Sequence, residues 1–341
     1  MSENKSKKVA VLGAGSWGTA LALVLQANGN NVTMWEFRPE AAERLKTEHE
    51  NKEFLPGVPI PSEIYITGDL IETCTNKDIL VVAVPSHVVR SVAEKIDKIS
   101  MENPPIVVNV AKGIENDSLM RMSEVLKSTI HWMTDELEVT LSGPSHAEEV
   151  SRKIPTAVVV AGNSGRSAEV VQQAFMNEYF RVYTNDDVIG VELGGALKNI
   201  IAIAAGICDG AGFGDNTKAA LQPRGLAEIA RLGTALGAKP VTFAGLSGMG
   251  DLIVTCMSRH SRNRFVGEQI GKGRKLPDIL KDMVMVAEGV RTTKSAYELS
   301  KKVGVDMPIT EQVYLSLFED KDPFQALQEL MTRDPKKEEL G

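Results

Sequence analysis

Short, continuous hydrophobic runs recur through the first half of the chain, and each is followed by a polar or glycine-containing segment. Runs of this length and composition predict β-strands buried on both faces, which is typical of a mostly parallel sheet covered by helices. Helix-like segments between the runs give the alternation expected of a doubly wound α/β domain. The predicted strands are residues 9–12, 32–35, 79–84, 106–110, 139–141 and 157–160.

The pattern changes near Asp187, beyond which strand-like runs largely disappear. Residues 190–206 are too long and too rich in alanine for a strand, and they predict a buried helix whose glycines allow close approach of another backbone. We therefore predict a sheet domain over 1–188, an all-helical domain over 189–332 and a charged, flexible tail over 333–341. Further helices are predicted at residues 217–236, 263–272, 276–281, 291–302 and 310–318.

A glycine-rich loop follows the first predicted strand directly. Gly13, Gly15 and Gly18 have the spacing G-x-G-x-x-G, a helix is predicted at 19–28, and the next strand ends at Glu36. In a dinucleotide-binding unit these glycines permit a tight turn, close approach of the pyrophosphate and close packing of helix on strand. The motif alone would also fit a surface turn. Its setting between a strand and a helix predicts a Rossmann-type NAD(P) site.

Polar residues follow three later strands at their carboxyl ends. Ser86 and His87 follow one strand, Lys112 follows the next, and residues 142–146 follow the third. Open α/β sheets bind their ligands outside these strand ends. The three loops are therefore candidates for ligand contacts.

Lys198 lies in an otherwise apolar part of the predicted helix 190–206. Burial lowers the pKa of a lysine towards neutrality, and a group with a pKa near the operating pH is well suited to protonate a carbonyl oxygen during its reduction. The alternative is a lysine whose stem covers apolar surface while its ammonium group reaches water. Taken alone, the residue favours this second interpretation.

A second concentration of polar residues lies between residues 248 and 264. Arg262 and Arg264 flank Asn263, where a helix is predicted to begin, and guanidinium groups beside helix N–H donors suit a phosphate. Asp251 follows two nearby glycines and can orient an ammonium group. A solvated helix start would explain the basic residues equally well, so the chemistry leaves both interpretations open.

The chain of 341 residues has 38 basic and 45 acidic residues, for a net charge of −7. This balance argues against a general nucleic-acid-binding protein, which needs a basic face, but allows a local basic pocket for an anionic small molecule. The longest apolar stretch, 200–208, is shorter than the roughly 20 residues of a membrane span. The N-terminus lacks the apolar core of a secretory signal.

Cysteines and histidines give no sign of a disulfide framework or a metal site. Cys74, Cys208 and Cys256 are far apart and odd in number, which favours a reducing cytoplasm. The five histidines show no metal-ligand spacing with each other or with cysteine. We therefore expect a cytoplasmic protein without a bound metal.

Short segments distributed over nearly the whole chain form an ordered series. They are residues 13–20, 111–113, 142–145, 192–199, 225–228, 250–252, 261–264, 286–289 and 307–309. Together and in this order they resemble the bacterial NAD(P)-dependent glycerol-3-phosphate dehydrogenase family. The resemblance implies an α/β domain followed by an all-α domain, and interconversion of dihydroxyacetone phosphate and sn-glycerol 3-phosphate. It also implies a role in supplying glycerol phosphate for membrane lipids.

The same resemblance implies roles for individual residues. Lys198 is implied as the general acid/base, Lys112 and Asp251 as its catalytic partners, and Asn199 as a residue that helps to position the substrate. The implied substrate contacts are Lys112, Gly143, Ser145, Lys198, Asp251, Ser261, Arg262 and Asn263. The implied cofactor contacts are Gly13, Gly15, Ser16, Trp17, Gly18, Arg38, Lys112, Ala147, Arg262, Val286 and Glu288.

The choice between NAD and NADP depends on the residues after the second strand. Family members often carry one or two arginines where Phe37 and Arg38 stand, and often an aromatic residue where this chain has His146. Glu36 favours the free ribose 2′-OH of NAD, whereas Arg38 can accommodate the 2′-phosphate of NADP. We therefore expect either cofactor to be used, with a mild preference for NADP from the resemblance.

Two other functions fit parts of the sequence. A related dehydrogenase of a 3-hydroxy acid or a sugar-acid phosphate would also carry a lysine on the first long helix of its helical domain, but residues 261–264 favour a small phosphorylated ketone. A protein that senses NAD(P) without turnover would not need Lys198, Asp251 and Arg262 together. The oligomeric state is open, with a homodimer as one option.

Overall fold

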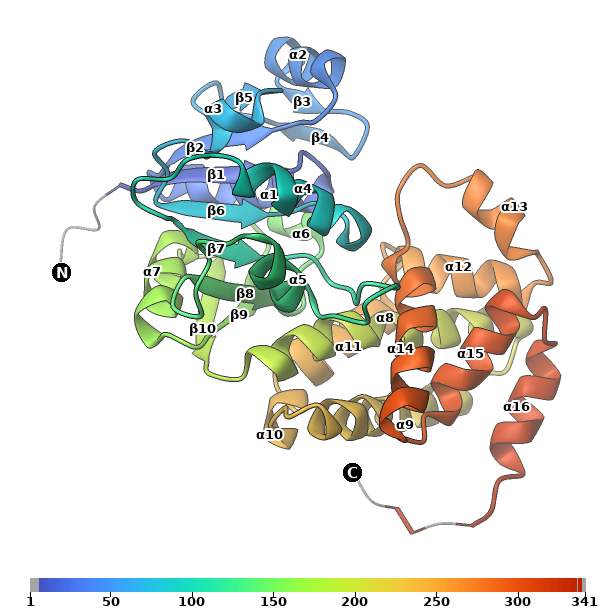
Figure 1. Ribbon diagram of the computed structural model, residues 1–341. Helices are drawn as coiled ribbons and strands as arrows, with labels where there is room; N and C mark the ends of the chain where they lie inside the picture. Colours follow the sequence, from blue (N-terminus) through green and yellow to red (C-terminus); the bar gives the residue numbers. More distant parts are fainter. Residues whose placement is uncertain (1–5, 336, 339–341) are drawn as a thin grey trace. The chain divides into compact units, whose positions relative to one another are not determined.

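The computed structural model describes residues 6–335 and 337–338 and divides into two compact units (Figure 1). The first unit contains the described residues up to Ala111 and the segment Met122–Val188. The second contains Lys112–Arg121 and the described residues from Ile189 onward. The first unit holds the central sheet, and the second is helical.

The first unit is built on an eight-stranded sheet. Its strands are β1 (Lys8–Leu12), β2 (Asn31–Trp35), β5 (Tyr65–Thr67), β6 (Ile79–Val82), β7 (Ile106–Asn109), β8 (Glu138–Ser142), β9 (Thr156–Gly162) and β10 (Phe180–Asn185). They lie in the order β10-β9-β8-β7-β6-β1-β2-β5, and neighbours are parallel except for β8 and β9, which are antiparallel. The predicted doubly wound, mostly parallel α/β sheet is confirmed.

Three parts of the β-structure were not predicted. They are β5, β10 and the antiparallel pair β3 (Glu50–Asn51) and β4 (Leu55–Pro59). β5 has only three residues at the sheet edge, and in β10 buried Phe180 and Val182 alternate with exposed polar residues. None of these segments forms the continuous apolar run from which the other strands were predicted.

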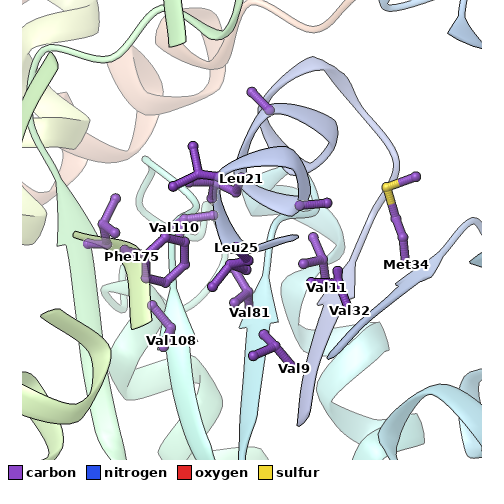
Figure 2. Close-up of a cluster of buried hydrophobic side chains, with 14 of the residues drawn as sticks. Val9, Val11, Leu21, Leu25, Val32, Met34, Val81, Val108, Val110 and Phe175 are labelled. Carbon is purple, nitrogen blue, oxygen red and sulfur yellow. The ribbon is translucent and has the colours of Figure 1, made fainter. Parts of the chain in front are cut away.

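Helices pack on this sheet and bury its hydrophobic side chains. Figure 2 shows Leu21 and Leu25 facing Val9 and Val81 of the sheet, with Phe175 beside them. All five side chains are fully buried, and burying one such side chain contributes about 1.5–3 kcal/mol. This packing fixes α1 against β1 and therefore also fixes the loop that joins them. The helices are α1 (Ser16–Ala27), α2 (Pro39–Glu48), α3 (Leu70–Cys74), α4 (Val89–Asp97), α5 (Met122–Thr129), α6 (Ala147–Val150) and α7 (Gly165–Phe175).

The second unit is all-helical in its described part. Its helices are α8 (Val188–Ala211), α9 (Asp215–Ala235), α10 (Pro240–Phe243), α11 (Asp251–Met257), α12 (Arg262–Gly271), α13 (Leu276–Lys281), α14 (Glu288–Val303), α15 (Pro308–Phe318) and α16 (Pro323–Met331). The predicted helices correspond to α8, α9 and α12 to α15, whereas α10, α11 and α16 were missed. α11 follows a glycine-rich turn, and only Ala326 of α16 is buried.

Glycines let α8 and α12 cross with their backbones in contact, as the sequence predicted for α8. A Cβ atom at Gly206 would lie 2.0 Å from the carbonyl oxygen of Arg264. A Cβ atom at Gly267 would lie 1.9 Å from the carbonyl oxygen of Ile203. Because no side chain fits at either position, these glycines fix the start of α12 against the helix that carries Lys198.

The segment Lys112–Arg121, here called the strap, packs in the helical unit, although we predicted it within the sheet domain 1–188. The Arg121 guanidinium pairs with the buried Glu192 carboxylate of α8 at 2.5 Å. Ser295 Oγ lies 3.0 Å from the carbonyl oxygen of Ile114. These contacts join residues far apart in the chain, so no local pattern could place the strap.

The predicted flexible tail, 333–341, is only partly described. Arg333 pairs with Asp306 at 2.6 Å, which links the first residue of that range to the helical unit. Residues 336 and 339–341 lie outside the described residues, so the prediction of flexibility stays untested there.

Two helical segments, Val188–Ala211 and Pro240–Met257, are long and apolar enough to cross a membrane by length and composition alone. In the first, 94% of the most apolar window is buried inside the protein, as in the core helix of a globular protein. In the second, the buried share is 44%. The prediction of no membrane span used the shorter run 200–208 and overlooked the full length of α8, although the burial of α8 favours a core helix.

Glu228 of α9 caps the start of α15 and joins two of the segments that carried the family resemblance. Its carboxylate accepts hydrogen bonds from the backbone N–H groups of Ile309 (2.6 Å) and Thr310 (3.1 Å) and from Thr310 Oγ1 (3.2 Å). Backbone N–H groups in the first turn of a helix have no partner within the helix. Glu228 therefore stabilises the contact of α9 with α15.

Replacing Glu228 should destabilise the helical unit. Glu228→Ala leaves two buried N–H donors without their acceptor, which should lower the free energy of unfolding by about 2 kcal/mol. Urea unfolding followed by circular dichroism measures this change. Glu311→Ala, also in α15, removes a largely exposed ion pair with Lys301 of α14 and should cost below about 1 kcal/mol. Equal effects of the two variants would show that the Glu228 cap is not stabilising.

Candidate functional site

The glycine-rich loop turns tightly between β1 and α1. Gly13 has φ = +114°, a conformation that disfavours side chains, and a Cβ atom there would lie 2.8 Å from the carbonyl oxygen of Ala83. A Cβ atom at Gly18 would lie 1.9 Å from the carbonyl oxygen of Gly13. The first glycine therefore permits the turn, and the third permits the helix to pack on it.

The start of α1 presents backbone donors that fit a dinucleotide. Gly15 occupies the N-cap position in extended conformation, and no atom lies within 4 Å of where its Cβ would be. α1 begins at Ser16, earlier than the predicted residue 19, so Ser16 and Trp17 form its first turn. Trp17 Nε1 is buried without a hydrogen-bond partner in the described part of the chain. An open glycine at a helix N-terminus fits a pyrophosphate.

Three charged residues lie at the carboxyl end of β2, beside the glycine-rich loop. Arg38 Nε donates to the buried Glu36 at 2.9 Å, and its terminal nitrogens donate to Glu53 at 3.0 and 3.2 Å. The hydrogen bonds to Glu53 and Glu36 raise the pKa of Arg38 above its usual value. All three residues line a cavity of about 250 Å³ that Ala14 of the loop also borders.

The remaining candidates in the sheet unit follow β8. Gly143 has φ = +133°, and Ser145 Oγ donates to its carbonyl oxygen at 2.9 Å. Ala147 is the first residue of α6, and His146 precedes it as the N-cap. The candidates after β6, Ser86 and His87, lie in a short 3₁₀ turn, where the Ser86 side chain is buried.

The helical unit brings Lys198, Asp251 and Lys112 into direct contact. Lys198 Nζ contacts Asp251 Oδ1, and Lys112 Nζ donates to Asp251 Oδ2 at 2.7 Å. Asp251 is 1% exposed, whereas the Lys112 side chain is 19% exposed. The Lys198 side chain is buried, so the interpretation as a lysine that reaches water is wrong. One carboxylate is therefore shared by two lysines.

Burial and charge shift the pKa values of this cluster. Burial lowers the pKa of Lys198 to about 8, although the neighbouring Asp251 carboxylate acts in the opposite direction. Burial alone would raise the pKa of Asp251, but the positive charges of Lys112 and Lys198 outweigh it and hold that pKa below its usual value. Near neutral pH, Asp251 is therefore ionised and Lys198 can exchange a proton.

Thr255 is a member of the cluster that the sequence analysis missed. Lys198 Nζ donates to Thr255 Oγ1 at 2.7 Å, and that hydroxyl lies 2.6 Å from the carbonyl oxygen of Asp251. Thr255 stands one helical turn after Asp251, so predicting α11 would have placed both on one face. The threonine orients the Lys198 ammonium together with Asp251.

Asn199 and Asn263 form a buried link between three helices. Asn263 Nδ2 donates to Asn199 Oδ1, and the backbone N–H of Gly289 donates to Asn263 Oδ1, both at 2.9 Å. The amide of Asn263 thus connects α8, α12 and the first turn of α14. Because Asn199 directly follows Lys198 in the chain, this link supports the helix that carries the cluster.

Arg262 and its neighbours occupy the start of α12. Ser261 is the N-cap, and its Oγ accepts a hydrogen bond from the backbone N–H of Arg264 at 3.2 Å. The Arg262 guanidinium donates to the carbonyl oxygen of Val286 at 2.9 Å, close to Glu288, the first residue of α14. This contact connects two of the segments that carried the resemblance.

The sequence suggested that Arg264 and Arg262 lie at the same phosphate site, but Arg264 points to other partners. Its Nε and a terminal nitrogen contact Asp209 Oδ2 at 2.7 and 2.6 Å, and Lys218 pairs with the other carboxylate oxygen at 2.6 Å. The alternation of side chains on a helix turns Arg264 away from the face of Arg262 and towards α8. Arg264 therefore supports the helix packing instead of a ligand.

Among residues 6–335 and 337–338, no group of three or more histidine, cysteine, aspartate or glutamate side chains could hold a metal ion. The polar side chains of the described lysine cluster and of the start of α12 are those of lysine, arginine, aspartate, asparagine, serine and threonine.

Comparisons with known proteins agree with this geometry. The model of the NAD-dependent glycerol-3-phosphate dehydrogenase N-terminus matches residues 8–168, and that of the C-terminus matches residues 187–328. A protein of Thermoanaerobacter sp. (strain X514) named glycerol-3-phosphate dehydrogenase [NAD(P)+] is 57% identical over 334 residues, covering 98% of this chain and 99% of the relative.

Solved structures give the same result. The crystal structure of glycerol-3-phosphate dehydrogenase from Coxiella burnetii is 37% identical, with a TM-score of 0.91 over 96% of this chain and 99% of that one. The enzyme of Plasmodium falciparum is 25% identical, with a TM-score of 0.87 over 97% of both chains. The chain therefore belongs to the NAD-dependent glycerol-3-phosphate dehydrogenase family.

Proposed function

We propose that this protein reduces dihydroxyacetone phosphate to sn-glycerol 3-phosphate with NAD(P)H, and that the reaction is reversible. The observation that carries the proposal is the buried cluster in which Lys198 and Lys112 share the Asp251 carboxylate. The relatives' names specify the reaction, and the cluster supplies the proton donor that such a reaction needs. A protein that only senses NAD(P) would not need this donor.

The residues of the cluster have complementary tasks in the proposed reaction. When bound, NAD(P)H supplies the hydride that adds to the carbonyl carbon. As negative charge develops on the carbonyl oxygen, the Lys198 ammonium polarises that oxygen and donates its proton to it. Asp251 and Thr255 hold Lys198 Nζ in place. The positive charge of Lys112, which donates to the other oxygen of Asp251, adds to the effect of burial in lowering the pKa of Lys198. Lys198 then regains a proton from solvent, and in the reverse direction it acts as the base.

The substrate phosphate is proposed to bind near Arg262, at the N-terminus of α12. A guanidinium group can hold a phosphate through two hydrogen bonds, and the N–H groups of the first helical turn favour an anion. α12 has ten residues and begins at Arg262, with Ser261 as its cap. Gly143, Ser145 and Asn263 remain proposed substrate contacts.

Arg262→Ala should weaken the enzyme selectively towards the phosphorylated ketone. Because Arg262 is only partly buried, the loss should be near the lower limit for such contacts, about 2 kcal/mol or thirtyfold in kcat/KM. The kcat/KM for unphosphorylated dihydroxyacetone, a poor substrate, should change far less. Arg259→Ala, an exposed arginine on the preceding turn, is the control. An equal loss with both ketones would assign Arg262 to the fold or the cofactor alone.

The overall proposal is tested by following the oxidation of NADH and of NADPH in a spectrophotometer with dihydroxyacetone phosphate as the substrate. Oxidation should require this ketone and should not occur with keto acids or sugar-acid phosphates. Binding of NADH without oxidation would favour the sensing function, and preference for a keto acid would favour the related dehydrogenases.

Several broader assignments accompany the proposal. The product would supply the glycerol phosphate backbone of membrane lipids. Cys74, Cys208 and Cys256 are free and buried thiols, which suits the cytoplasmic location expected from the sequence. A homodimer remains an option, and size-exclusion chromatography with light scattering would decide it.

A further inference from the structure

Arg38 is fixed by four side chains at the edge of the cavity beside the glycine-rich loop. Both terminal nitrogens of the guanidinium donate hydrogen bonds to Glu53, at 3.0 and 3.2 Å, and Nε donates to Glu36 Oε1 at 2.9 Å. The guanidinium carbon also lies 5.6 Å from the ring centroids of Phe37 and of Phe54. One N–H group on each of the three guanidinium nitrogens therefore donates to a carboxylate.

The segment that carries Glu53 is itself tied to the glycine-rich loop. Asn51 Nδ2 is buried and donates to the carbonyl oxygen of Ala14 at 2.7 Å and to Thr19 Oγ1 at 2.9 Å. The backbone N–H of Phe54 donates to Asn51 Oδ1 at 3.2 Å. Glu53 lies between these two anchored residues, so its carboxylate is held at the cavity that the loop borders.

This cavity is where a Rossmann-type domain binds the adenosine ribose, at the end of β2 next to the glycine-rich loop. Glu36 uses only Oε1 in hydrogen bonds recorded within the described residues, and its Oε2 can accept a bond from a ribose hydroxyl. A 2′-phosphate would instead bring nearly two negative charges beside Glu36 and Glu53. To hold that phosphate with the two N–H groups that now donate to Glu53, Arg38 would have to leave Glu53.

We propose that Glu53 directs cofactor preference towards NAD(H) by occupying both terminal nitrogens of Arg38. Glu53 is a positioning residue, because it acts through Arg38 on the ribose substituent. The inference rests on the proposed function, and it replaces the mild preference for NADP expected from the family resemblance. Removing the Glu53 charge should both release Arg38 and remove a repulsive group, so the two effects add in favour of NADPH.

The test compares equilibrium binding of NADH and NADPH, which differ only in the 2′-phosphate, by nicotinamide fluorescence. Wild-type protein should bind NADH more tightly. Glu53→Gln should tighten NADPH binding by about tenfold while changing NADH by less than about twofold. The matched control is Glu48→Gln, because Glu48 lines the same cavity but pairs with Lys52 instead of Arg38. Its NADPH-to-NADH ratio should stay at the wild-type value.

A double variant separates release of Arg38 from general loss of negative charge. In the Arg38→Ala background, Glu53→Gln should give less than about a third of its gain for NADPH, because the arginine that binds the phosphate is absent. A purely structural role of Glu53 would instead change NADH and NADPH binding by the same factor.

The outcomes separate this inference from the proposed function. An unchanged NADPH-to-NADH ratio in Glu53→Gln, an equal change in Glu48→Gln, or a wild-type preference for NADPH would each overturn the role of Glu53 while the dehydrogenase activity stands. Failure of wild-type protein to bind either dinucleotide would overturn the proposed function, and this inference with it.

Discussion

Lys198→Met should lose at least about a hundredfold in kcat for dihydroxyacetone phosphate at neutral pH, because both the proton and the positive charge at the carbonyl oxygen are removed. Methionine keeps an unbranched apolar stem in the buried helix α8, so the variant should fold and bind NAD(P)H. Steady-state kinetics measure kcat, and thermal unfolding with cofactor fluorescence confirms the fold and the binding. Near-normal kcat in a folded, cofactor-binding variant would show that the proton has another source.

The pH dependence of the wild-type enzyme gives an independent check on Lys198. Burial lowers the pKa of Lys198 to about 8, and ketone reduction needs the protonated form. The rate of reduction should therefore fall as pH rises through about 8, whereas the rate of glycerol phosphate oxidation should rise over the same interval. This fall in the rate of reduction near pH 8, the alkaline limb of the pH–rate profile, should be absent from the residual activity of Lys198→Met. Its persistence there would assign the titration to another group.

Asp251→Asn should destabilise the protein by about 3 kcal/mol at pH 7 because it leaves the buried Lys198 ammonium without its counter-charge. The estimate takes the lower limit for such pairs, since Lys112 is partly exposed. Urea unfolding at several pH values measures the loss. A lysine whose folded pKa lies below its unfolded value stabilises the fold at high pH and loses that contribution as pH falls. The deficit of the variant should therefore shrink between pH 7 and pH 9.

Asp251→Asn should also shift the alkaline limb of the pH–rate profile for ketone reduction. Without the carboxylate, which raises the pKa of Lys198, that pKa should fall further, and reduction should decline at a lower pH than in wild type. Thr255→Val, which removes a neutral hydrogen bond to the same ammonium group, should shift the limb much less. A loss below about 1 kcal/mol in Asp251→Asn, with an unshifted limb, would contradict the proposed electrostatic coupling.

The parts of the fold that follow from local pattern were predictable. Continuous apolar strands and the G-x-G-x-x-G spacing each depend on residues close together in the chain, so the sheet, the loop and α8 were predicted from the sequence. β10 escaped because an edge strand buries only one face, and α11 escaped because its apolar residues follow a glycine-rich turn. Short or one-sided elements give too few apolar residues to reveal their period.

The candidate site was predictable in residue type but not in pairing. Chemistry alone favoured Lys198 as a snorkelling lysine, and only its contact with Asp251, 53 residues away, shows it to be buried. Arg262 and Arg264 looked equivalent in sequence, but Arg264 forms an ion pair with Asp209 on another helix. Glu53 carried no signal of its own, because its importance comes from the direction of the Arg38 side chain. Such long-range partners need the folded chain.

The strap has a consequence for how this protein can be divided. The helical body is discontinuous in sequence: a fragment starting at Ile189 would contain Glu192 without Arg121 and Asp251 without Lys112. Each omission would leave a buried carboxylate with fewer counter-ions. A gene fusion or recombination event that exchanged the C-terminal half at this junction would therefore transfer an incomplete lysine–aspartate cluster. The ten residues Lys112–Arg121 would have to be inherited together with the helices they complete.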